Sequence, residues 1–293
     1  MKLKSTLENY IFVLPAVTIF AVFYIIPFIW VLHLGLYEWD GIVPTKVFVG
    51  LGNFKEILFE DKIWWSSMRN AGYITLIALT LQNALAFLLA WACDRQIRMK
   101  NFYRALFFIP PVLSEVVVGL VWQWILDGNY GLLNGWLTSA GFPSLARSWL
   151  SDPNTALTAV ALVHCWKGFG WGFLIFLAGL QTIPRELYEA GRVDGANAWS
   201  SFKNITLPLM MPVAVLVAIL TILGTMQGFI MIIAMTDGGP AYHTQVPVLR
   251  ILASMRGSSR FGYACAQGIS FGVIMVALSF IQYRFSRLRR DIA

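Results

Sequence analysis

Charged residues are scarce in this chain of 293 residues. Lysine, arginine, aspartate and glutamate together make up 13% of it, whereas apolar residues make up 58%. A soluble globular domain has about 25% charged residues, so the composition excludes a water-soluble fold and predicts an integral membrane protein. The formal net charge of +7 does not indicate a nucleic-acid-binding protein, because the basic excess lies in short segments between apolar runs.

Cysteine and histidine are also few, with three of each. An odd number of cysteines in or beside apolar runs excludes a disulfide framework and a zinc site, and it predicts buried, small apolar residues. The histidines are scattered and supply neither a metal site nor a convergent set of acid–base groups. We therefore expect no metal and no cofactor. The cysteines are Cys93, Cys165 and Cys265.

The sequence also lacks the G-x-x-x-x-G-K-[ST] pattern of a phosphate-binding P-loop. The glycines in Trp166–Gly172 do not form a G-x-G-x-x-G pattern either, because Phe173 stands where the third glycine would be. Small residues in membrane helices favour close packing, which is our interpretation of these glycines; the alternative is that their missing side chains widen a solute pathway. The chain shows no ATPase chemistry, and we do not expect it to be an enzyme.

Six apolar runs are long enough for membrane-spanning helices, which need about 20 mostly apolar residues. The first lies close to the N-terminus, but it exceeds the apolar core of about 7–15 residues in a signal peptide, so we interpret it as a retained span. The predicted fold is all-α, with six transmembrane helices in a single transmembrane domain over residues 1–293. The predicted spans are Ile11–Leu32, Ala71–Cys93, Ala105–Leu126, Ala156–Leu180, Leu207–Thr236 and Phe261–Tyr283.

The distribution of basic residues predicts the orientation of the spans. With the N-terminus in the cytoplasm, Lys2 and Lys4 included, the inner segments carry the whole excess of positive charge, and the outer segments hold equal numbers of acidic and basic residues. The even number of spans and the basic tail Arg284–Arg290 agree with this arrangement. We therefore expect both termini to be cytoplasmic, with Thr182–Pro212 inside the cell.

Thr182–Pro212 is a polar interruption between two long uncharged runs. Pro184 suits the first turn of a helix, Arg185–Val193 contains no helix breaker, and Gly195 can adopt the positive φ that ends a helix. We expect a second short helix over Ala198–Ile205. The segment is too polar to enter hydrocarbon, because it carries the charges of Arg185, Glu186, Glu189, Arg192, Asp194 and Lys203.

Three motifs in this interruption resemble the EAA loop of ABC-importer permeases: Glu189-Ala190-Gly191, Asp194-Gly195-Ala196 and Ile205-Thr206-Leu207-Pro208. Gly191 departs from the family pattern, which has a second alanine there. The substitution loses about 1 kcal/mol of helix propensity and would soften the first short helix.

The resemblance implies that this loop docks on a cytoplasmic ATPase subunit and couples ATP hydrolysis to transport. Small side chains at positions 190 and 191 would allow close approach to a partner groove, and Glu189 offers a carboxylate to a basic partner residue. The alternative is a loop that merely links two spans. The predicted coupling residues are Glu189, Ala190, Gly191, Asp194, Gly195, Ala196, Ile205, Leu207 and Pro208.

Further motifs extend the resemblance over nearly the whole chain and indicate the carbohydrate-type subgroup. Thr236–Pro240 is similar to the Thr-x-Gly-Gly-Pro of permeases such as the maltose-importer F-type and glycerol-phosphate A-type subunits, and it would place Gly238, Gly239 and Pro240 in a loop on the binding-protein side. The other motifs are Arg69-Asn70, Gln82-Asn83-Ala84-Leu85-Ala86, Phe102-x-Arg104, Phe108-Ile109-Pro110, Trp122-x-Trp124 and Leu180-Gln181-x-Ile183-Pro184.

The resemblance implies a type I ABC importer permease fold in a bacterial or archaeal cytoplasmic membrane. The chain would be one half of a heterodimeric permease. Its implied partners are a second, G-type permease subunit, two cytoplasmic ATPase subunits, an extracellular or periplasmic solute-binding protein, a small sugar as substrate, and membrane lipid, but no nucleic acid.

A sugar-like solute needs hydroxyl partners and flat apolar surfaces. Trp171 could stack on a sugar ring. In the fifth span Thr221, Thr225 and Gly228 share one helical face at spacings of four and three, with Gln227 adjacent. The motif resemblance places solute contacts in the same two spans; the alternative for each residue is polar packing between helices. The predicted pathway residues are Gly168, Trp171, Thr221, Thr225, Gln227 and Gly228.

Glu115 and Lys167 are intramembrane charges, which are functional candidates by default. A structural ion pair and a pathway-lining role both fit them. We predict an importer permease for a sugar or related polyol. The first alternative is glycerol-3-phosphate or a phosphodiester as solute, which calls for basic pathway residues, and only Lys167 qualifies. A secondary transporter or a membrane enzyme is the alternative from another class.

Overall fold

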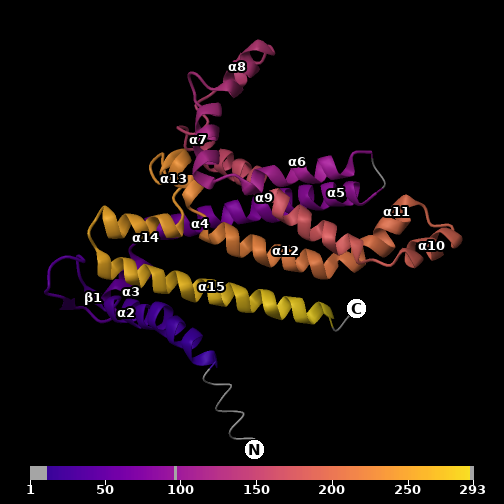
Figure 1. Ribbon diagram of the computed structural model, residues 1–293. Helices are drawn as coiled ribbons and strands as arrows, with labels where there is room; N and C mark the ends of the chain where they lie inside the picture. The colour runs from indigo at the N-terminus through magenta and orange to yellow at the C-terminus, as the bar shows by residue number, and fades with distance from the viewer. Residues whose placement is uncertain (1–11, 96–97, 291–293) are drawn as a thin grey trace, which may run out of the picture. The chain divides into compact units, whose positions relative to one another are not determined.

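The computed structural model describes residues 12–95 and 98–290 and is almost entirely helical (Figure 1). Lys2, Lys4 and Ile11, which belong to the predicted inner segment and first span, lie outside the described residues. The chain divides into two compact units: unit 1 contains Met1–Lys62 and Arg250–Val276, and unit 2 contains Ile63–Leu249 and Ala277–Ala293. The prediction of a single transmembrane domain stays a prediction.

Within the described ranges, five helices are long and apolar enough to cross a membrane, and a bent pair of shorter helices would make a sixth span. This confirms the prediction of an all-α membrane protein, and the predicted number of six spans is reached if the bent pair crosses as one span. The five long helices are Phe12–Leu34, Lys62–Asp94, Ala156–Gln181, Ala198–Gln227 and Phe261–Arg284.

Unit 1 begins with the helix Phe12–Leu34, which ends in a small β-hairpin and a short helix. In the hairpin Tyr37 pairs with Phe48 and Glu38 with Val47, and Asn53 donates to the carbonyl oxygens of Gly35 (2.9 Å) and Tyr37 (3.0 Å). The elements are η1 (a π-helical turn, Ala21–Ile25), α2 (Ile26–Leu34), β1 (Tyr37–Glu38), β2 (Val47–Phe48) and α3 (Gly52–Phe59).

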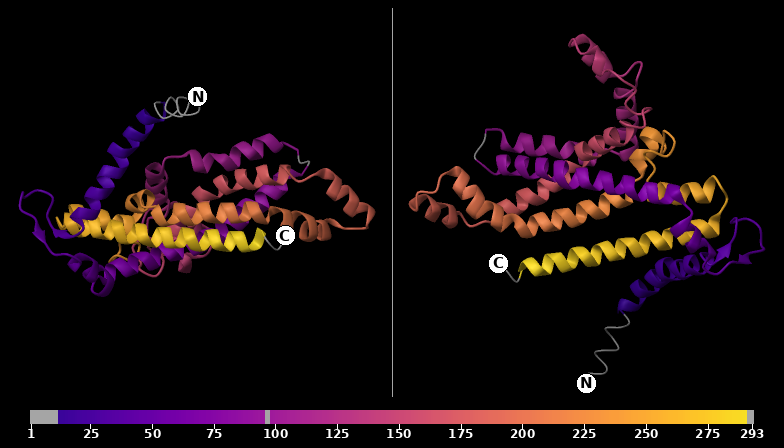
Figure 2. Two further views of the ribbon diagram at one scale, coloured as in Figure 1. Left: turned by 90° about the horizontal axis from the view of Figure 1, so that it is seen from below. Right: turned by 180° about the vertical axis from the view of Figure 1, so that it is seen from behind.

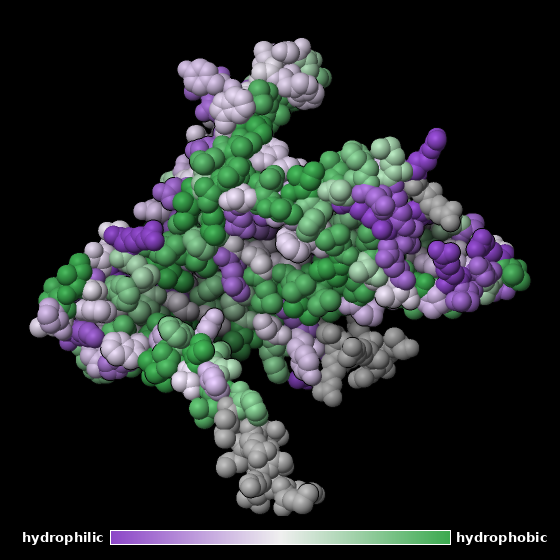
Figure 3. Space-filling view, in the orientation of Figure 1, coloured by the Kyte–Doolittle hydropathy of each residue, from purple (hydrophilic) through white to green (hydrophobic). Residues whose placement is uncertain are grey.

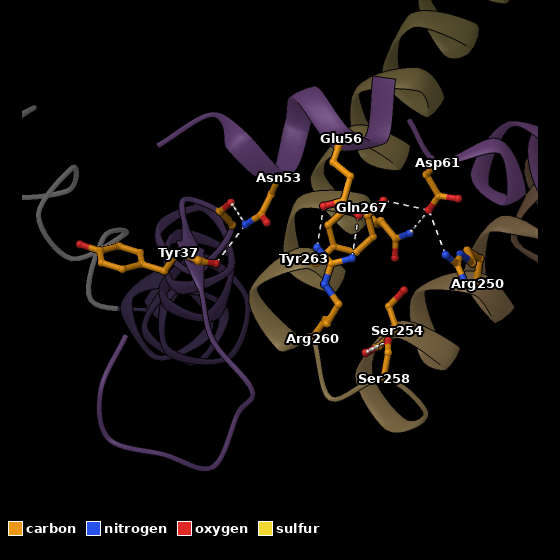
Figure 4. A network of polar contacts seen from close by, with 11 residues as sticks. Tyr37, Asn53, Glu56, Asp61, Arg250, Ser254, Ser258, Arg260, Tyr263 and Gln267 are labelled. Carbon is orange, nitrogen blue, oxygen red and sulfur yellow. Dashed lines mark hydrogen bonds and ion pairs between the residues drawn. The ribbon is translucent and has the colours of Figure 1, made fainter. Parts of the chain in front are cut away.

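Ionic contacts in unit 1 join α3 and Asp61, which follows it, to α14 (Pro247–Arg256) and to the beginning of α15 (Phe261–Arg290) (Figure 4). The carboxylate of Asp61 accepts hydrogen bonds from Tyr263 (2.8 Å), Arg250 (3.1 Å) and Gln267 (3.3 Å). Arg260 forms a two-pronged pair with Glu56 at 2.6 and 2.7 Å, and this hydrogen bonding raises the pKa of the Arg260 guanidinium. These three hydrogen bonds give the Asp61 carboxylate the partners that it needs, because the residue is only 9% exposed to solvent.

Unit 2 is a helical bundle that is organised around α9 (Figures 1 and 2). Its elements in chain order are α4 (Lys62–Ile77), η2 (a π-helical turn, Ala78–Gln82), α5 (Asn83–Asp94), α6 (Lys100–Val112), α7 (Glu115–Ile125), α8 (Leu132–Ser139), η3 (a 3₁₀ turn, Pro143–Leu145), α9 (Ala156–Gln181), α10 (Arg185–Val193), α11 (Ala198–Ser201), η4 (a π-helical turn, Phe202–Thr206), α12 (Leu207–Gln227) and α13 (Ile230–Thr236).

The core of unit 2 lies where α9 packs against α5, α6 and α12. Small residues allow this close approach: a Cβ on Gly172 would lie 3.2 Å from Ala86 of α5, and one on Gly179 would lie 2.8 Å from Val213 of α12. The three cysteines are free and buried, as predicted. The buried apolar cluster contains Ala86, Ala90, Cys93, Phe169, Phe173, Phe176, Leu177, Leu180, Ile183, Met210 and Val217.

The predicted third span, Ala105–Leu126, was wrong as a continuous helix. It is divided into α6 and α7, which meet at an angle of 93°. Pro110 and Pro111 form the last turn of α6, where each lacks an N–H and its ring crowds the carbonyl of the residue four positions earlier. Leu113 and Ser114 are extended, so the bend follows directly from the two prolines.

The predicted fifth span, Leu207–Thr236, also differs from the structure. A helix runs unbroken from Ala198 to Gln227, and Pro208 lies inside it, just after the π-helical turn η4. Such a local π-helical turn accommodates a proline within a membrane helix. The predicted short helix Ala198–Ile205 is therefore the beginning of this span. At the other end Gly228 is extended, and α13 begins as a separate helix.

Candidate translocation site and coupling surface

A cavity of about 360 Å³ lies within unit 2. It is lined by side chains of α4, η2, α7, α9, α12 and α13, and it adjoins both irregular points of the bundle: the bend that precedes α7 and the break at Gly228. Irregular backbone at membrane depth is tolerated where it lines a cavity. Of the eight predicted intramembrane site residues, seven line it: Glu115, Lys167, Gly168, Trp171, Thr221, Thr225 and Gly228.

Gln227 is the predicted pathway residue that does not line this cavity. Its side chain is exposed, whereas Thr225 is 3% exposed and faces the cavity. An α-helix turns by about 100° per residue, so two positions along the chain place Gln227 on nearly the opposite side of α12. The prediction included Gln227 because it is adjacent in sequence to residues of the cavity face. The rotation of the helix between neighbouring residues turns its side chain away from that face.

Trp171 forms an apolar wall of the cavity. It is 56% exposed, and its ring meets Phe108 edge-on with a centroid separation of 5.7 Å. Gly168, one turn earlier on α9, leaves room for Gln82: a Cβ there would lie 2.6 Å from the amide oxygen of Gln82. An exposed aromatic ring beside polar groups suits a sugar face.

The two threonines have hydroxyl groups that already bond to neighbouring helices. Thr225 shares a 2.7 Å hydrogen bond with Thr75 of α4. Thr221 donates to the carbonyl of Val217 (2.8 Å) and lies 3.1 Å from Asn83 Oδ1. Both threonines therefore line the cavity and also hold α12 against α4 and α5, which is the polar packing named above as the alternative; their pathway role stays a prediction.

Glu115 and Lys167 form an ion pair at the bend between α6 and α7. Lys167 Nζ lies 3.9 Å from Glu115 Oε1 and 3.5 Å from the carbonyl oxygen of Pro111. The lysine side chain is 14% exposed and the glutamate side chain is 44% exposed. Both residues also line the cavity; the ion pair is present in the structure, and the pathway role stays a prediction.

Two polar residues that line the cavity, Gln82 and His164, were not predicted as site residues. Gln82 was recognised only as part of a motif, and His164 only as one of three scattered histidines. A polar side chain within an apolar run is the signal that could have identified both.

A groove of about 580 Å³ separates α10 from α11. Gly195 has a φ of +79° and ends α10 as predicted, and Asn197 caps α11 by accepting a 2.8 Å hydrogen bond from the Ser200 N–H. Tyr188 and Thr206 share a 2.9 Å hydrogen bond that holds α10 to the beginning of α12. Six predicted coupling residues line the groove: Ala190, Gly191, Asp194, Gly195, Ala196 and Ile205.

Glu189, Leu207 and Pro208 are predicted coupling residues that lie outside this groove. All three are exposed, and α10 and α11 form the end of unit 2 where hydrophilic residues gather (Figure 3). Exposed apolar side chains accompany them, with Val193 at 88% and Trp199 at 69%. This mixture of charged and apolar exposed groups suits a protein-docking surface.

We predict that Gly191→Ala will stabilise α10. The added Cβ would lie 3.1 Å from Ile205 Cδ1, which is the end of a flexible side chain and can shift, while alanine gains up to about 1 kcal/mol of helix propensity. Amide hydrogen exchange in α10 should slow about fivefold in the purified protein. Ala190→Gly is the matched control and should speed exchange; faster exchange in Gly191→Ala would show that Ile205 cannot move.

The predicted binding-protein-side loop follows α13 directly. Asp237 and Gly238 have φ angles of +48° and +81°, and a Cβ on Gly238 would collide with the Gln245 amide oxygen, so only glycine fits there. Gly239 and Pro240 line a polar cavity of about 430 Å³ together with Asp127. Hydrogen bonds from the N–H groups of Tyr130 and Asn129 hold the pKa of Asp127 below its usual value.

Side-chain hydrogen bonds hold this loop in one conformation. Thr244 shares a 2.7 Å hydrogen bond with Thr236 and donates to the Gly239 carbonyl at 2.8 Å. Asn70 of α4 donates to the carbonyl oxygens of Gln245 (3.0 Å) and Tyr242 (3.3 Å). The loop therefore presents a fixed surface.

The sequence matches a protein family over residues 82–291, which is most of the chain and includes the cavity, the groove and this loop. The family is described as the binding-protein-dependent transport system inner membrane component. The chain belongs to this family. It is thus a multi-pass permease subunit of an ABC importer, which works with a solute-binding protein, and the predictions of its family, its permease role and its non-enzymatic nature are confirmed.

Curated relatives match the permease over nearly its whole length. The trehalose/maltose transport system permease protein MalF of Thermococcus litoralis is 28% identical, over 99% of this chain and 97% of the relative. The sn-glycerol-3-phosphate transport system permease protein UgpA of Agrobacterium fabrum is 31% identical, over 96% of this chain and 94% of the relative.

A solved structure shares the fold of the permease. A bacterial ABC transporter involved in the import of the acidic polysaccharide alginate contains a chain that is 23% identical, with a TM-score of 0.82, over 98% of this chain and 97% of that chain. At this level of identity the likeness concerns the fold alone, and it confirms the predicted importer-permease fold.

Proposed function

We propose that this permease subunit imports a sugar or related polyol, in an ATP-driven system. The observation that carries the proposal is the cavity in unit 2, where the exposed ring of Trp171 faces a small number of polar groups. Saccharide sites combine flat apolar surfaces with convergent hydrogen-bonding groups. The similarity to a trehalose/maltose permease supports the same class of solute.

A glycerol-3-phosphate importer is the second candidate, because a permease for that solute is 31% identical to this chain. A phosphate group would call for positive charge in the cavity. Among the described residues that line the cavity, Lys167 is the one lysine or arginine, and Glu115 neutralises it. The cavity therefore favours the sugar.

The surface formed by α10 and α11 is the proposed site of ATPase docking, on the cytoplasmic side. The groove lined by Ala190, Gly191 and Gly195 would receive a partner side chain, and Glu189 would pair with a basic residue at its edge. The hydrogen bond between Tyr188 and Thr206 joins α10 to the span that lines the solute cavity. A movement of the ATPase would thereby reach α12 as a rigid-body movement.

The remaining parts of the assembly follow from this orientation. Both termini would be cytoplasmic, and the loop that contains Gly238, Gly239 and Pro240 would lie outside and receive solute from the binding protein. A G-type permease subunit would complete the pathway, and two ATPase subunits would supply the energy. In alternating access the cavity would open outward when ATP closes the ATPase pair, and inward after hydrolysis.

Affinity purification of the importer through a tag on this chain tests the docking proposal. Glu189→Lys should remove the ATPase subunits from the purified complex by at least tenfold, because it replaces the expected charge pair with a repulsion. Glu60→Lys, an equal charge reversal that is exposed in unit 1, should retain them. Normal ATPase recovery with Glu189→Lys, or solute uptake by this chain alone in liposomes, would contradict the proposal.

A further inference from the structure

Gln82 presents an unpartnered polar atom at the solute cavity. The residue is 7% exposed and lies in the π-helical turn η2. Its amide oxygen is buried and has no hydrogen-bond partner among the described residues, yet the side chain lines the cavity. An unpartnered buried acceptor is costly. Gly168 packs against the Gln82 side chain, since a Cβ there would lie 2.6 Å from this oxygen, so the cavity that Gln82 lines is the side from which a donor of a bound molecule would approach.

The ion pair at the same cavity is too long for a direct charge-assisted hydrogen bond. Such bonds between an ammonium and a carboxylate measure about 2.7–2.9 Å, whereas Lys167 Nζ and Glu115 Oε1 are 3.9 Å apart. The glutamate side chain is 44% exposed and has unused acceptor capacity. A solute hydroxyl between the two groups could donate to Glu115 and accept from Lys167.

We propose that Gln82, Glu115 and Lys167 determine the specificity of the cavity, and that together they select uncharged polyhydroxylated solutes over anionic ones. One hydroxyl of a saccharide would bridge the Glu115–Lys167 pair, and a second would donate to the Gln82 amide oxygen. Trp171 would cover one face of the ring. This inference rests on the proposed sugar-import function and names the residues that determine which class of solute binds in the cavity.

The opposite charges of the pair explain the preference for neutral solutes. An anionic group would be attracted by Lys167, but Glu115 lies 3.9 Å from the same ammonium and repels that group. The repulsion from Glu115 offsets part of the attraction to Lys167. The pair adds no net charge to the cavity, so it offers a donor and an acceptor without attracting free anions.

The test measures solute binding to the complete importer complex, purified in detergent through a tag on this chain and studied without its binding protein. The neutral probes are radiolabelled maltose, trehalose, lactose and diacetylchitobiose. The anionic probes are sn-glycerol-3-phosphate and a digalacturonate. We expect the unmodified complex to bind at least one neutral probe at least tenfold more tightly than either anionic probe.

Three variants separate a selective role from a structural one. Gln82→Leu should weaken binding of the neutral probe at least tenfold. Glu115→Gln should weaken it similarly and strengthen glycerol-3-phosphate binding, because Lys167 would lose its counter-charge. Glu115→Asp should keep the neutral preference, since the charge remains. Thr80→Val, in the same π-helical turn but exposed and outside the cavity, is the matched control and should change neither.

The inference would be overturned if Glu115→Gln weakened the binding of neutral and anionic probes equally while size-exclusion chromatography showed an intact complex. That result would leave the proposed sugar-import function standing. Unchanged affinities in both Gln82→Leu and Glu115→Gln would likewise overturn the inference and leave that function standing. Binding of anionic probes alone by the unmodified complex, or of no probe at all, would overturn the sugar assignment and the inference together. Recovery of the ATPase subunits is independent of all these outcomes.

Discussion

Replacing Gly170 with valine should prevent α6 from packing against α9 and leave little folded protein in the membrane. A Cβ on Gly170 would overlap the carbonyl oxygen of Phe107 and lie 2.5 Å from the ring of Pro111. The Phe107 carbonyl belongs to the position four residues before Pro111, where a proline removes the normal hydrogen bond. The exposed carbonyl can approach α9 closely only because no side chain intervenes, and a Cα–H contact there is a weak favourable interaction.

The expected effect of this change exceeds ordinary overpacking because a backbone atom obstructs the new side chain. Inserting extra groups into a packed core costs about 1–3 kcal/mol when side chains can move aside, and Gly170→Ala should fall at the upper end of that range. Gly170→Val adds two further methyl groups and should reduce the protein recovered from membranes at least tenfold.

Thermal unfolding in detergent and immunoblots of membrane fractions measure the Gly170 series. Gly72→Ala is the matched control, since nothing lies within 4 Å of a Cβ at Gly72 in α4; it should be neutral or slightly stabilising through helix propensity. A Gly170→Val protein with normal abundance and an unchanged unfolding temperature would show that the contact between α6 and α9 is looser than described.

Replacing Asp61 with alanine should destabilise unit 1 by about 3–5 kcal/mol, because it removes one partner of a buried ionic network and leaves the other in place. Arg250, Tyr263 and Gln267 all donate to the Asp61 carboxylate. Without it, the Arg250 guanidinium, whose side chain is 20% exposed, would lose its counter-charge. Asp61→Asn keeps the shape and one acceptor, and it should cost less.

Hydrogen exchange in α3, α14 and the first turns of α15, together with the unfolding temperature, would report this change. Glu56→Gln is the comparison, because the Glu56–Arg260 pair is about one-third exposed on each side; an exposed pair contributes about 0–1 kcal/mol. If Asp61→Ala and Glu56→Gln were equally mild, burial of Asp61 would not be the source of its contribution.

Local signals predicted the elements whose formation depends on neighbouring residues in the chain. Apolar runs of sufficient length identified the long helices, since a backbone in hydrocarbon must satisfy its own hydrogen bonds. Pro184 and Gly195 marked the ends of α10 correctly, because the conformations they impose are local. The family motifs identified the loop between α9 and α12 and the turn after α13.

The same signals failed where a proline or glycine can have more than one consequence. Pro110 and Pro111 bend the chain by 93° before α7, whereas Pro208 leaves its helix unbroken because the π-helical turn η4 precedes it. Gly228 ends α12, although Gly224 is accommodated within it. The hydropathy of these segments does not distinguish a continuous helix from a broken one, since each of the segments is apolar.

Sequence alone determined that this protein is a helical membrane permease with a polar loop between α9 and α12, because length, hydropathy and motif spacing are properties of consecutive residues. Only the tertiary structure decided which polar residues meet. Glu115 and Lys167 lie 52 positions apart and approach to 3.9 Å; Gln82 reaches the same cavity from another helix, and Gln227 does not. Helix rotation and packing set these relations, and both depend on neighbours distant in the chain.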